Sequence, residues 1–166
     1  MHKVIAMKTH SDKTRILFVC LGNICRSPSA EAIFKEYANR NQLDVEVDSA
    51  GTSAWHQGEK ADHRMRQSAL KRGYNITSLS RPFVRSDFEL FDLIVAMDDQ
   101  NFHDLTAKTL TSEEQGKIKR MSDFFIKSNF DHIPDPYYGG ADGFNLVIDL
   151  LEDASLGLID YLKKNK

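Results

Sequence analysis

The sequence contains little cysteine and no long apolar run, and each absence excludes a class of protein. Only Cys20 and Cys25 are present, too few for a fold held together by disulfides. Their Cys-x4-Cys spacing differs from that of a zinc ribbon, and the six histidines include no His-x3-His pair, so we expect neither a metal nor another cofactor. No window approaches the ~18 apolar residues of a membrane span, and the first residues lack the apolar core of a secretory signal. We therefore expect a cytoplasmic protein without a membrane partner.

An excess of charge of one sign is also missing. The 22 basic residues nearly balance the 24 acidic ones, and a net charge of −2 gives no general attraction to nucleic acid. The basic cluster at residues 117–120 is interrupted by Ile118, which is typical of the entrance to a strand. A length of 166 residues fits one domain with a sizeable core. We expect that domain to span residues 14–166, after a flexible extension of residues 1–13.

Short apolar runs alternate with stretches of helical periodicity along the chain. The apolar runs predict four strands, at residues 15–20, 45–47, 92–97 and 118–121. The longer helices are predicted at residues 27–40, 62–72, 98–107 and 142–164. A small-residue loop is expected at residues 48–52, and Ser86 with Glu89 has the form of a capping box. The alternation predicts a single α/β domain, with a four-stranded parallel sheet and helices on both faces.

The stretch from Val19 to Pro28 joins the first predicted strand to the first predicted helix. In such a turn, successive backbone N–H groups point inward together, and the helix N-terminus adds unpaired N–H groups and a positive dipole end. Cys20 ends the strand, and Arg26 follows six residues later. The donors around the sulfur favour its nucleophilic thiolate form, and the guanidinium fork matches two oxygens of a phosphate. We therefore predict a phosphate-binding loop after the first strand, although a cysteine there is, taken alone, most often a buried small hydrophobe.

Attack on a phosphate ester also needs a proton for the leaving oxygen, and a carboxylic acid can supply it to a phenolate at neutral pH. Asp135 is the candidate, because Pro134 and Pro136 restrict the backbone around it. The tyrosines and glycines that follow indicate an aromatic-lined loop able to reach the phosphate. Taken alone, an Asp-Pro pair more often forms a plain turn.

The ten residues from Val19 to Pro28 resemble the Cys-x5-Arg-Ser/Thr signature of the low-molecular-weight protein tyrosine phosphatases. The resemblance continues from Arg15 to the last helix, and it includes the string Asp-Pro-Tyr at residues 135–137. It implies that Cys20 is the nucleophile, that Arg26 binds the phosphate, and that Asp135 is the general acid.

The resemblance implies roles for further residues. The loop residues that bind phosphate would be Leu21, Gly22, Asn23, Ile24, Cys25 and Ser27. Asn23 and Ser49 would support the loop, and Ser27 would donate a hydrogen bond to the thiolate. Trp55 and Tyr137 would form aromatic walls of the substrate cleft, although for Trp55 plain packing is an equal alternative.

Three other positions carry hypotheses of their own. In the family, a cysteine at the place of Cys25 can form a disulfide with the nucleophile, so reversible inactivation by peroxide is one hypothesis, and simple packing is the other. Tyr138 is similar to a tyrosine that some members use as a phosphorylation site. Ser78 stands where some members have a histidine.

As a whole, the resemblance implies a protein tyrosine phosphatase that hydrolyses phosphotyrosine and aryl phosphate monoesters through a phosphocysteine intermediate. Its partner would be a phosphotyrosine-containing protein. Two other functions use the same kind of loop. Arsenate reduction relays oxidation through two further cysteines, and this sequence has none to spare. A phosphate- or phosphotyrosine-binding module would bind without turnover.

Overall fold

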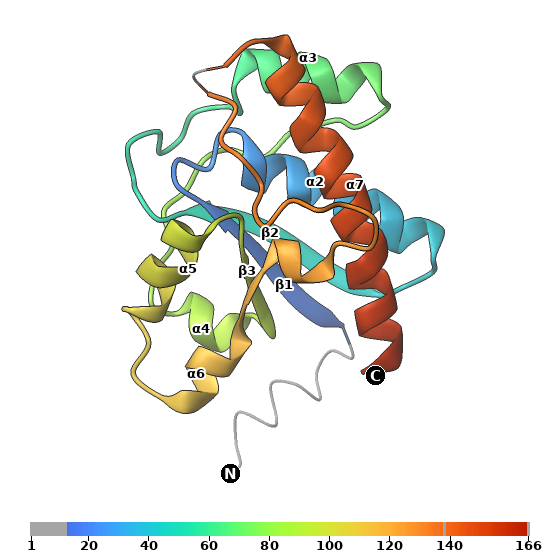
Figure 1. Ribbon diagram of the computed structural model, residues 1–166. Helices are drawn as coiled ribbons and strands as arrows, with labels where there is room; N and C mark the ends of the chain where they lie inside the picture. Colours follow the sequence, from blue (N-terminus) through green and yellow to red (C-terminus); the bar gives the residue numbers. More distant parts are fainter. Residues whose placement is uncertain (1–12, 138, 166) are drawn as a thin grey trace.

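The computed structural model describes residues 13–137 and 139–165, so the expected extension, apart from Lys13, lies outside the described residues. Its centre is one parallel sheet, as the sequence predicts (Figure 1). The four strands are β1 (Thr14–Cys20), β2 (Val45–Gly51), β3 (Leu93–Ala96) and β4 (Ile118–Arg120). Their order is β2-β1-β3-β4, which places β1 between β2 and β3. Strand order therefore reverses between β1 and β3, and ligands of open α/β sheets bind beyond the carboxyl ends of strands at such a point.

The second strand is longer than predicted. Residues 48–51 do not form a loop but continue β2, and Gly51 pairs with Cys20 at the end of the ladder. The small side chains there serve close packing: a Cβ on Gly51 would lie 2.7 Å from the carbonyl oxygen of Leu21. The prediction failed because small residues, which usually indicate a loop, are here required next to the turn that follows β1.

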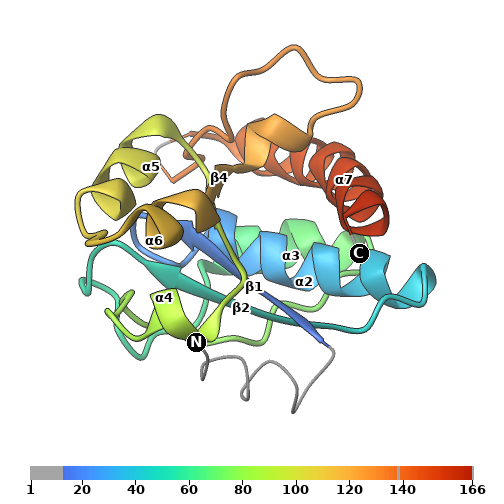
Figure 2. The same cartoon turned by 90° about the horizontal axis from the view of Figure 1, so that it is seen from below.

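Helices cover both faces of the sheet, as expected (Figure 2). One face of the sheet and its core cluster contact three helices, α2 (Arg26–Arg40), α3 (His63–Lys71) and α7 (Ala141–Lys164). The opposite cluster includes residues of two shorter helices, α4 (Asp87–Leu90) and α5 (Asp99–Thr106). Two elements flank the last strand, α6 (Ser112–Lys117) before it and the 3₁₀ helix η1 (Met121–Phe124) after it. Strand residues alternate between the two clusters: Ile16 and Phe18 belong to the first, Leu17 and Val19 to the second.

The ends of the helices agree with some of the capping residues that the sequence predicts and disagree with one. Asp62 caps α3 by accepting hydrogen bonds from two N–H groups of its first turn, and Gly73 beyond its end has φ +90°, the left-handed conformation expected of a terminating glycine. The predicted capping box of Ser86 and Glu89 is wrong, since the Ser86 side chain makes no capping hydrogen bond. The neighbouring carboxylate of Asp87 instead accepts the N–H of Val84 at 2.8 Å.

The close approach of α7 to η1 gives a first stability prediction. A Cβ on Gly157 would lie 1.8 Å from the carbonyl oxygen of Phe124, so backbone would have to move to admit alanine. We expect Gly157→Ala to lower the free energy of unfolding by about 3 kcal/mol, as overpacking does in tight cores. Urea denaturation measures the change. Gly116→Ala is the matched control, because nothing lies within 4 Å of a Cβ there and helix propensity favours alanine; equal midpoints for the two variants would contradict the prediction.

Candidate active site

The turn between β1 and α2, residues 20–27, lies at the point where strand order reverses; we call it the phosphate loop. Its carbonyl groups are bound by the surrounding chain: those of Cys20 and Ile24 accept the N–H groups of Thr52 and Asp62 at 2.9 and 2.8 Å. The carbonyl of Gly22 accepts the Ser80 hydroxyl at 2.9 Å. Among the described residues, none accepts a hydrogen bond from the N–H groups of residues 21–25. The loop is therefore anchored through its carbonyls and keeps its N–H donors for a ligand.

The helix that follows adds to this donor set. Cys25 is the N-cap of α2 and its side chain makes no capping hydrogen bond, so no side chain of the helix occupies the N–H groups of the first turn. Their orphan donors and the positive end of the helix dipole favour an anion. Cys20 ends β1 at the start of the phosphate loop and is 3% exposed, and its Sγ is 3.0 Å from the Ser27 hydroxyl.

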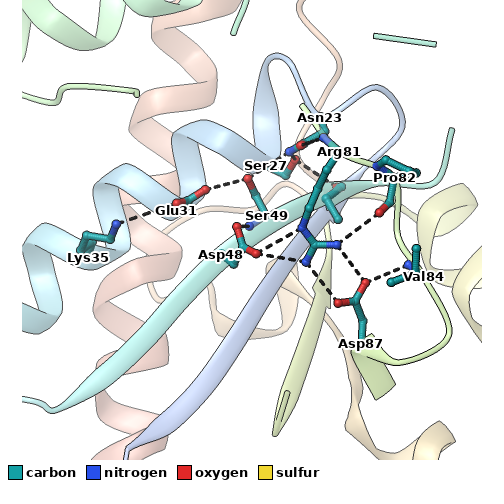
Figure 3. A network of polar contacts seen from close by, with 11 residues as sticks. Asn23, Ser27, Glu31, Lys35, Asp48, Ser49, Arg81, Pro82, Val84 and Asp87 are labelled. Atoms are coloured by element: carbon teal, nitrogen blue, oxygen red, sulfur yellow. Dashed lines mark hydrogen bonds and ion pairs between the residues drawn. The ribbon is translucent and has the colours of Figure 1, made fainter. Parts of the chain in front are cut away.

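A network of buried polar side chains supports the loop from below (Figure 3). Asn23 adopts φ +57° and is 2% exposed, and its amide nitrogen donates to the hydroxyls of Ser27 at 2.8 Å and Ser49 at 3.0 Å. The Ser49 hydroxyl donates to the carboxylate of Glu31 on α2 at 2.7 Å. Burial raises the pKa of Glu31, and the hydrogen bond from Ser49 opposes that shift. The Asn23 carbonyl oxygen accepts the N–H of Arg81 at 2.9 Å.

Arg26 is held by Asp98, a residue that the sequence analysis places only at the start of a predicted helix. Its guanidinium, 3% exposed, donates through Nη1 to Asp98 at 2.6 Å and to the carbonyl of Ile133 at 3.0 Å. Burial lowers the pKa of Arg26, but the negative charges of Cys20, Asp98 and Asp135 outweigh it and raise that pKa above its ordinary value. Asp98 follows β3 directly, at the strand next to β1, and that position was the signal for its role.

A cavity of about 80 Å³ opens above the phosphate loop. It is lined by Cys20, Leu21, Gly22, Ile24, Cys25, Arg26, Trp55, His56, Asp135 and Tyr137. Asn23, Ser27 and Ser49 do not line the cavity, because their side chains lie beneath the loop. Trp55 is 75% exposed, so it does not pack into the core.

The lining includes one residue that sequence reasoning missed. The His56 ring lies 6.4 Å from the ring of Tyr137, and its Nδ1 is 3.0 Å from Glu59. A Cβ on Gly22 would lie 3.0 Å from the His56 ring, so histidine needs a glycine opposite it in the phosphate loop. The only signal in the sequence was its position directly after Trp55.

Asp135 reaches the cavity from the segment before α7. Its Oδ2 is 3.8 Å from Nη2 of Arg26, while its Oδ1 accepts the N–H of Tyr137 at 3.0 Å. Arg64 on α3 fixes this segment from the other side, donating to the Tyr137 carbonyl at 3.0 Å and to Asp62 at 3.0 Å. The carboxylate is 39% exposed, so solvent reaches it. The neighbouring Tyr138 lies outside the described residues.

Both cysteines are free and buried. Burial raises the pKa of Cys25 far above its ordinary value, and the nearby charge of Asp62 adds to the shift. Cys25 is therefore a neutral thiol at neutral pH, next to a sulfur surrounded by donors. In the described part of the chain, no three His, Cys, Asp or Glu side chains are grouped so as to hold a metal ion. No described helix has the length and apolar character needed to cross a membrane.

Known proteins share this architecture and sequence over nearly the whole chain. The sequence model of a family described as low molecular weight phosphotyrosine protein phosphatase matches residues 15–166. A low molecular weight protein-tyrosine-phosphatase of Streptomyces coelicolor is 42% identical over 150 residues, which cover 87% of this chain and 91% of the relative. The crystal structure of a protein tyrosine phosphatase from Entamoeba histolytica superposes with a TM-score of 0.90 at 46% identity, covering 92% of this chain and 99% of that one. The crystal structure of DARP, a Drosophila arginine phosphatase, gives a TM-score of 0.83 at 34% identity, covering 89% and 97%.

Proposed function

The chain belongs to the low molecular weight phosphotyrosine protein phosphatase family, and from that premise we propose that it hydrolyses phosphotyrosine and aryl phosphate monoesters through a phosphocysteine intermediate. The observation that carries the proposal is the environment of Cys20. Cys20 lines the cavity, together with loop N–H groups for which the described residues supply no acceptor, the N-terminus of α2 and the guanidinium of Arg26. This arrangement stabilises negative charge on the sulfur and on a bound phosphate alike.

The first step transfers the phosphoryl group to the enzyme. The Cys20 thiolate attacks phosphorus, the sulfur–phosphorus bond forms and the bond to the phenolic oxygen breaks. Asp135, in its protonated form, gives its proton to the leaving phenolate. Arg26 and the loop N–H groups bind the equatorial oxygens, where charge is spread in the transition state.

The second step regenerates the enzyme. The Asp135 carboxylate takes a proton from a water molecule as that water attacks phosphorus. The sulfur–phosphorus bond breaks and the Cys20 thiolate leaves, stabilised by the hydrogen bond from the Ser27 hydroxyl 3.0 Å away. Inorganic phosphate departs, so no cofactor is consumed.

The choice of substrate follows from the walls of the cavity. The exposed ring of Trp55 and the ring of Tyr137 both line it, which suits a flat aromatic group better than a flexible guanidine chain. Initial rates on a phosphotyrosine peptide, a phosphoserine peptide and a phosphoarginine peptide test this choice, and a quenched reaction should carry phosphate on Cys20 by mass spectrometry. Faster hydrolysis of phosphoarginine, or turnover without phosphate on Cys20, would contradict the proposal.

Trp55 offers the most direct test of the aromatic wall. We expect Trp55→Ala to raise KM for a phosphotyrosine peptide about fivefold, the effect of about 1 kcal/mol of lost ring contact, and to change kcat little. The side chain is 75% exposed, so the urea midpoint should not move. Exposed Leu110, far along the chain in the segment before α6, provides the control variant Leu110→Ala. An unchanged KM in Trp55→Ala would remove the residue from the binding site.

We also propose that Cys25 protects Cys20 against peroxide. Peroxide oxidises the Cys20 thiolate to a sulfenic acid; the Cys25 sulfur then attacks it, a disulfide forms and the hydroxyl leaves as water with the Cys25 proton. Because burial raises the pKa of Cys25, disulfide closure should become about tenfold faster per pH unit as its thiolate fraction grows. We expect dithiothreitol to restore oxidised wild type more fully than Cys25→Ser, each relative to its own untreated rate. Equal recovery would contradict the protective role.

A thiol nucleophile sets the compartment in which the protein can work. Cys20 must stay reduced, and both cysteines are free in the structure. We therefore place the protein in the cytoplasm, where thiols are kept reduced. Its functional unit on this proposal is residues 14–166, and its partners are phosphotyrosine-containing proteins.

A further inference from the structure

The amide group of Asn23 has a single possible orientation. Its oxygen faces the N–H of Arg81 at 2.9 Å, and because a backbone N–H only donates, that position must be oxygen and not nitrogen. Both hydrogens of the nitrogen are then donated, one to Ser27 and one to Ser49. The N–H of Arg81 thus determines the direction of every hydrogen bond that Asn23 makes.

The donor-to-acceptor direction set at Asn23 extends through the hydroxyl of Ser27 to the nucleophile. Each of the two serine hydroxyls accepts from Asn23 and has one hydrogen left to donate. Ser49 donates its hydrogen to the carboxylate of Glu31 at 2.7 Å. Ser27 has two possible acceptors, the Cys20 sulfur at 3.0 Å and the carbonyl of Ala50 at a longer 3.4 Å. The bond accepted from Asn23 turns the Ser27 hydrogen away from the amide, and the nearer acceptor for that hydrogen is the Cys20 sulfur, which as a thiolate can only accept.

Arg81 is itself held by two carboxylates, those of Asp48 and Asp87, as Figure 3 shows. Neither carboxylate lines the cavity. Its guanidinium binds both carboxylate oxygens of Asp87 at 3.1 Å and one oxygen of Asp48 at 3.0 Å. Asp87 is 2% exposed and also accepts the N–H of Val84, so it fixes the chain on both sides of Pro82. The Arg81 carbonyl accepts the N–H of Gly51 at 2.9 Å. Side chain and main chain together fix the place of the one N–H that orients Asn23.

We propose that Arg81 and Asp87 are positioning residues for the nucleophile, because their ion pair fixes the Asn23 amide and so makes the Ser27 hydroxyl donate to Cys20. The proposal rests on the proposed function, since its effect falls on phosphocysteine breakdown. In that step Cys20 leaves as a thiolate, and a hydrogen bond to the departing charge is worth most there. Formation of phosphocysteine, in which the sulfur loses its charge, gains less from the same bond.

Pre-steady-state kinetics with p-nitrophenyl phosphate separate the two steps: the burst of nitrophenolate reports phosphocysteine formation, and the following linear phase reports its breakdown. For Arg81→Met we expect the linear phase to slow about tenfold, the loss of one hydrogen bond to a charged group, and the burst rate to change less than threefold. Arg72→Met is the matched control. Arg72 is 30% exposed against 31% for Arg81 and is paired with Asp149 and Glu152, between α3 and α7. Equal linear phases in the two variants would overturn the proposal.

A double-mutant cycle tests whether Arg81 acts through Ser27. In a Ser27→Ala background, Arg81→Met should slow the linear phase no further, because the hydroxyl that it directs is gone. A second tenfold loss in that background would overturn the proposal. If Arg81→Met does not fold, Arg81→Lys and Asp87→Asn enter the same cycle.

One measurement is independent of turnover. The side-chain amide group of Asn23 is buried in the wild type, and both of its protons are hydrogen-bonded. We expect their exchange with deuterated solvent to accelerate at least tenfold in Arg81→Met but not in Arg72→Met. Unchanged exchange would overturn the proposal even if the enzyme is active. Conversely, a wild type that forms no phosphocysteine, with exchange behaving as expected, would count against the proposed function and leave the orienting role of Arg81 supported.

Discussion

Replacing Cys20 with serine should abolish hydrolysis of aryl phosphates, with kcat falling about 10⁴-fold or more, as when a covalent nucleophile is removed. A serine hydroxyl keeps its proton at neutral pH, whereas the structure surrounds this position with donors suited to a sulfur anion. The substitution fits the space, because only one atom changes and the Ser27 hydroxyl 3.0 Å away can still form a hydrogen bond with it. Steady-state rates on p-nitrophenyl phosphate measure the effect.

Phosphate binding distinguishes the loss of the nucleophile from damage to the phosphate site. Cys20→Ser should bind inorganic phosphate with a Kd within about threefold of wild type, since Arg26 and the loop N–H groups are untouched. Its urea midpoint should stay the same. If the wild type binds a phosphotyrosine peptide without hydrolysing it, the chain is a binding module and the mechanism fails. If both proteins hydrolyse equally, a nucleophile other than Cys20 does the work.

Most of the fold could be predicted from the sequence, because its signals are local. The apolar run of β1 and the periodicity of α2 identify themselves within a few residues, and the alternation of the two element types predicts a parallel sheet. The small residues at 48–52 predict a loop, whereas residues 48–51 belong to β2, because their small size is required by packing against another part of the chain. Gly51 has no Cβ because the carbonyl of Leu21 occupies that space, and the sequence of β2 does not contain this fact.

In the candidate site too, contacts between residues close in sequence could be predicted and contacts made by the fold could not. Cys20 and Arg26 belong to one continuous string, so their closeness in space follows from the turn that joins a strand to a helix. Asp98 comes to Arg26 from 72 residues away, and only the strand order that places β3 beside β1 brings it there. At Ser86 the predicted capping box is absent, and the carboxylate next to it, Asp87, is paired with Arg81, a contact that the local sequence pattern does not reveal.

The contacts of Arg26 also constrain how the acid can act. Nη1 is already occupied by Asp98 and by the carbonyl of Ile133. Nη2 faces Asp135 at 3.8 Å, beyond hydrogen-bond distance, so it stays available to a phosphate oxygen. One buried guanidinium thus lies between two carboxylates, one bonded tightly and one loosely. The tightly bound Asp98 holds the arginine in place, and the loosely bound, more exposed Asp135 is the carboxylate that lines the cavity, where a leaving group would lie.

We therefore expect Asp135→Ala to lower kcat about 10²- to 10³-fold on phenyl phosphate, within the range of general acid catalysis. On dinitrophenyl phosphate, whose leaving group departs without help, the loss should be less than about tenfold, because only the proton donation is missing. Steady-state kinetics on the two esters give the ratio. Equal losses on both would remove Asp135 as the acid and leave it a structural role.

Asp135→Asn makes this test sharper, because it separates the proton from the shape of the segment. Asparagine keeps an oxygen that can accept the N–H of Tyr137, the 3.0 Å bond that shapes the turn, but it has no acidic proton to give. We expect its losses to match those of Asp135→Ala on both esters. If instead asparagine restores hydrolysis of phenyl phosphate to near wild-type rates, the residue acts by shaping the segment that carries Tyr137, and the proton for the leaving phenolate must come from solvent.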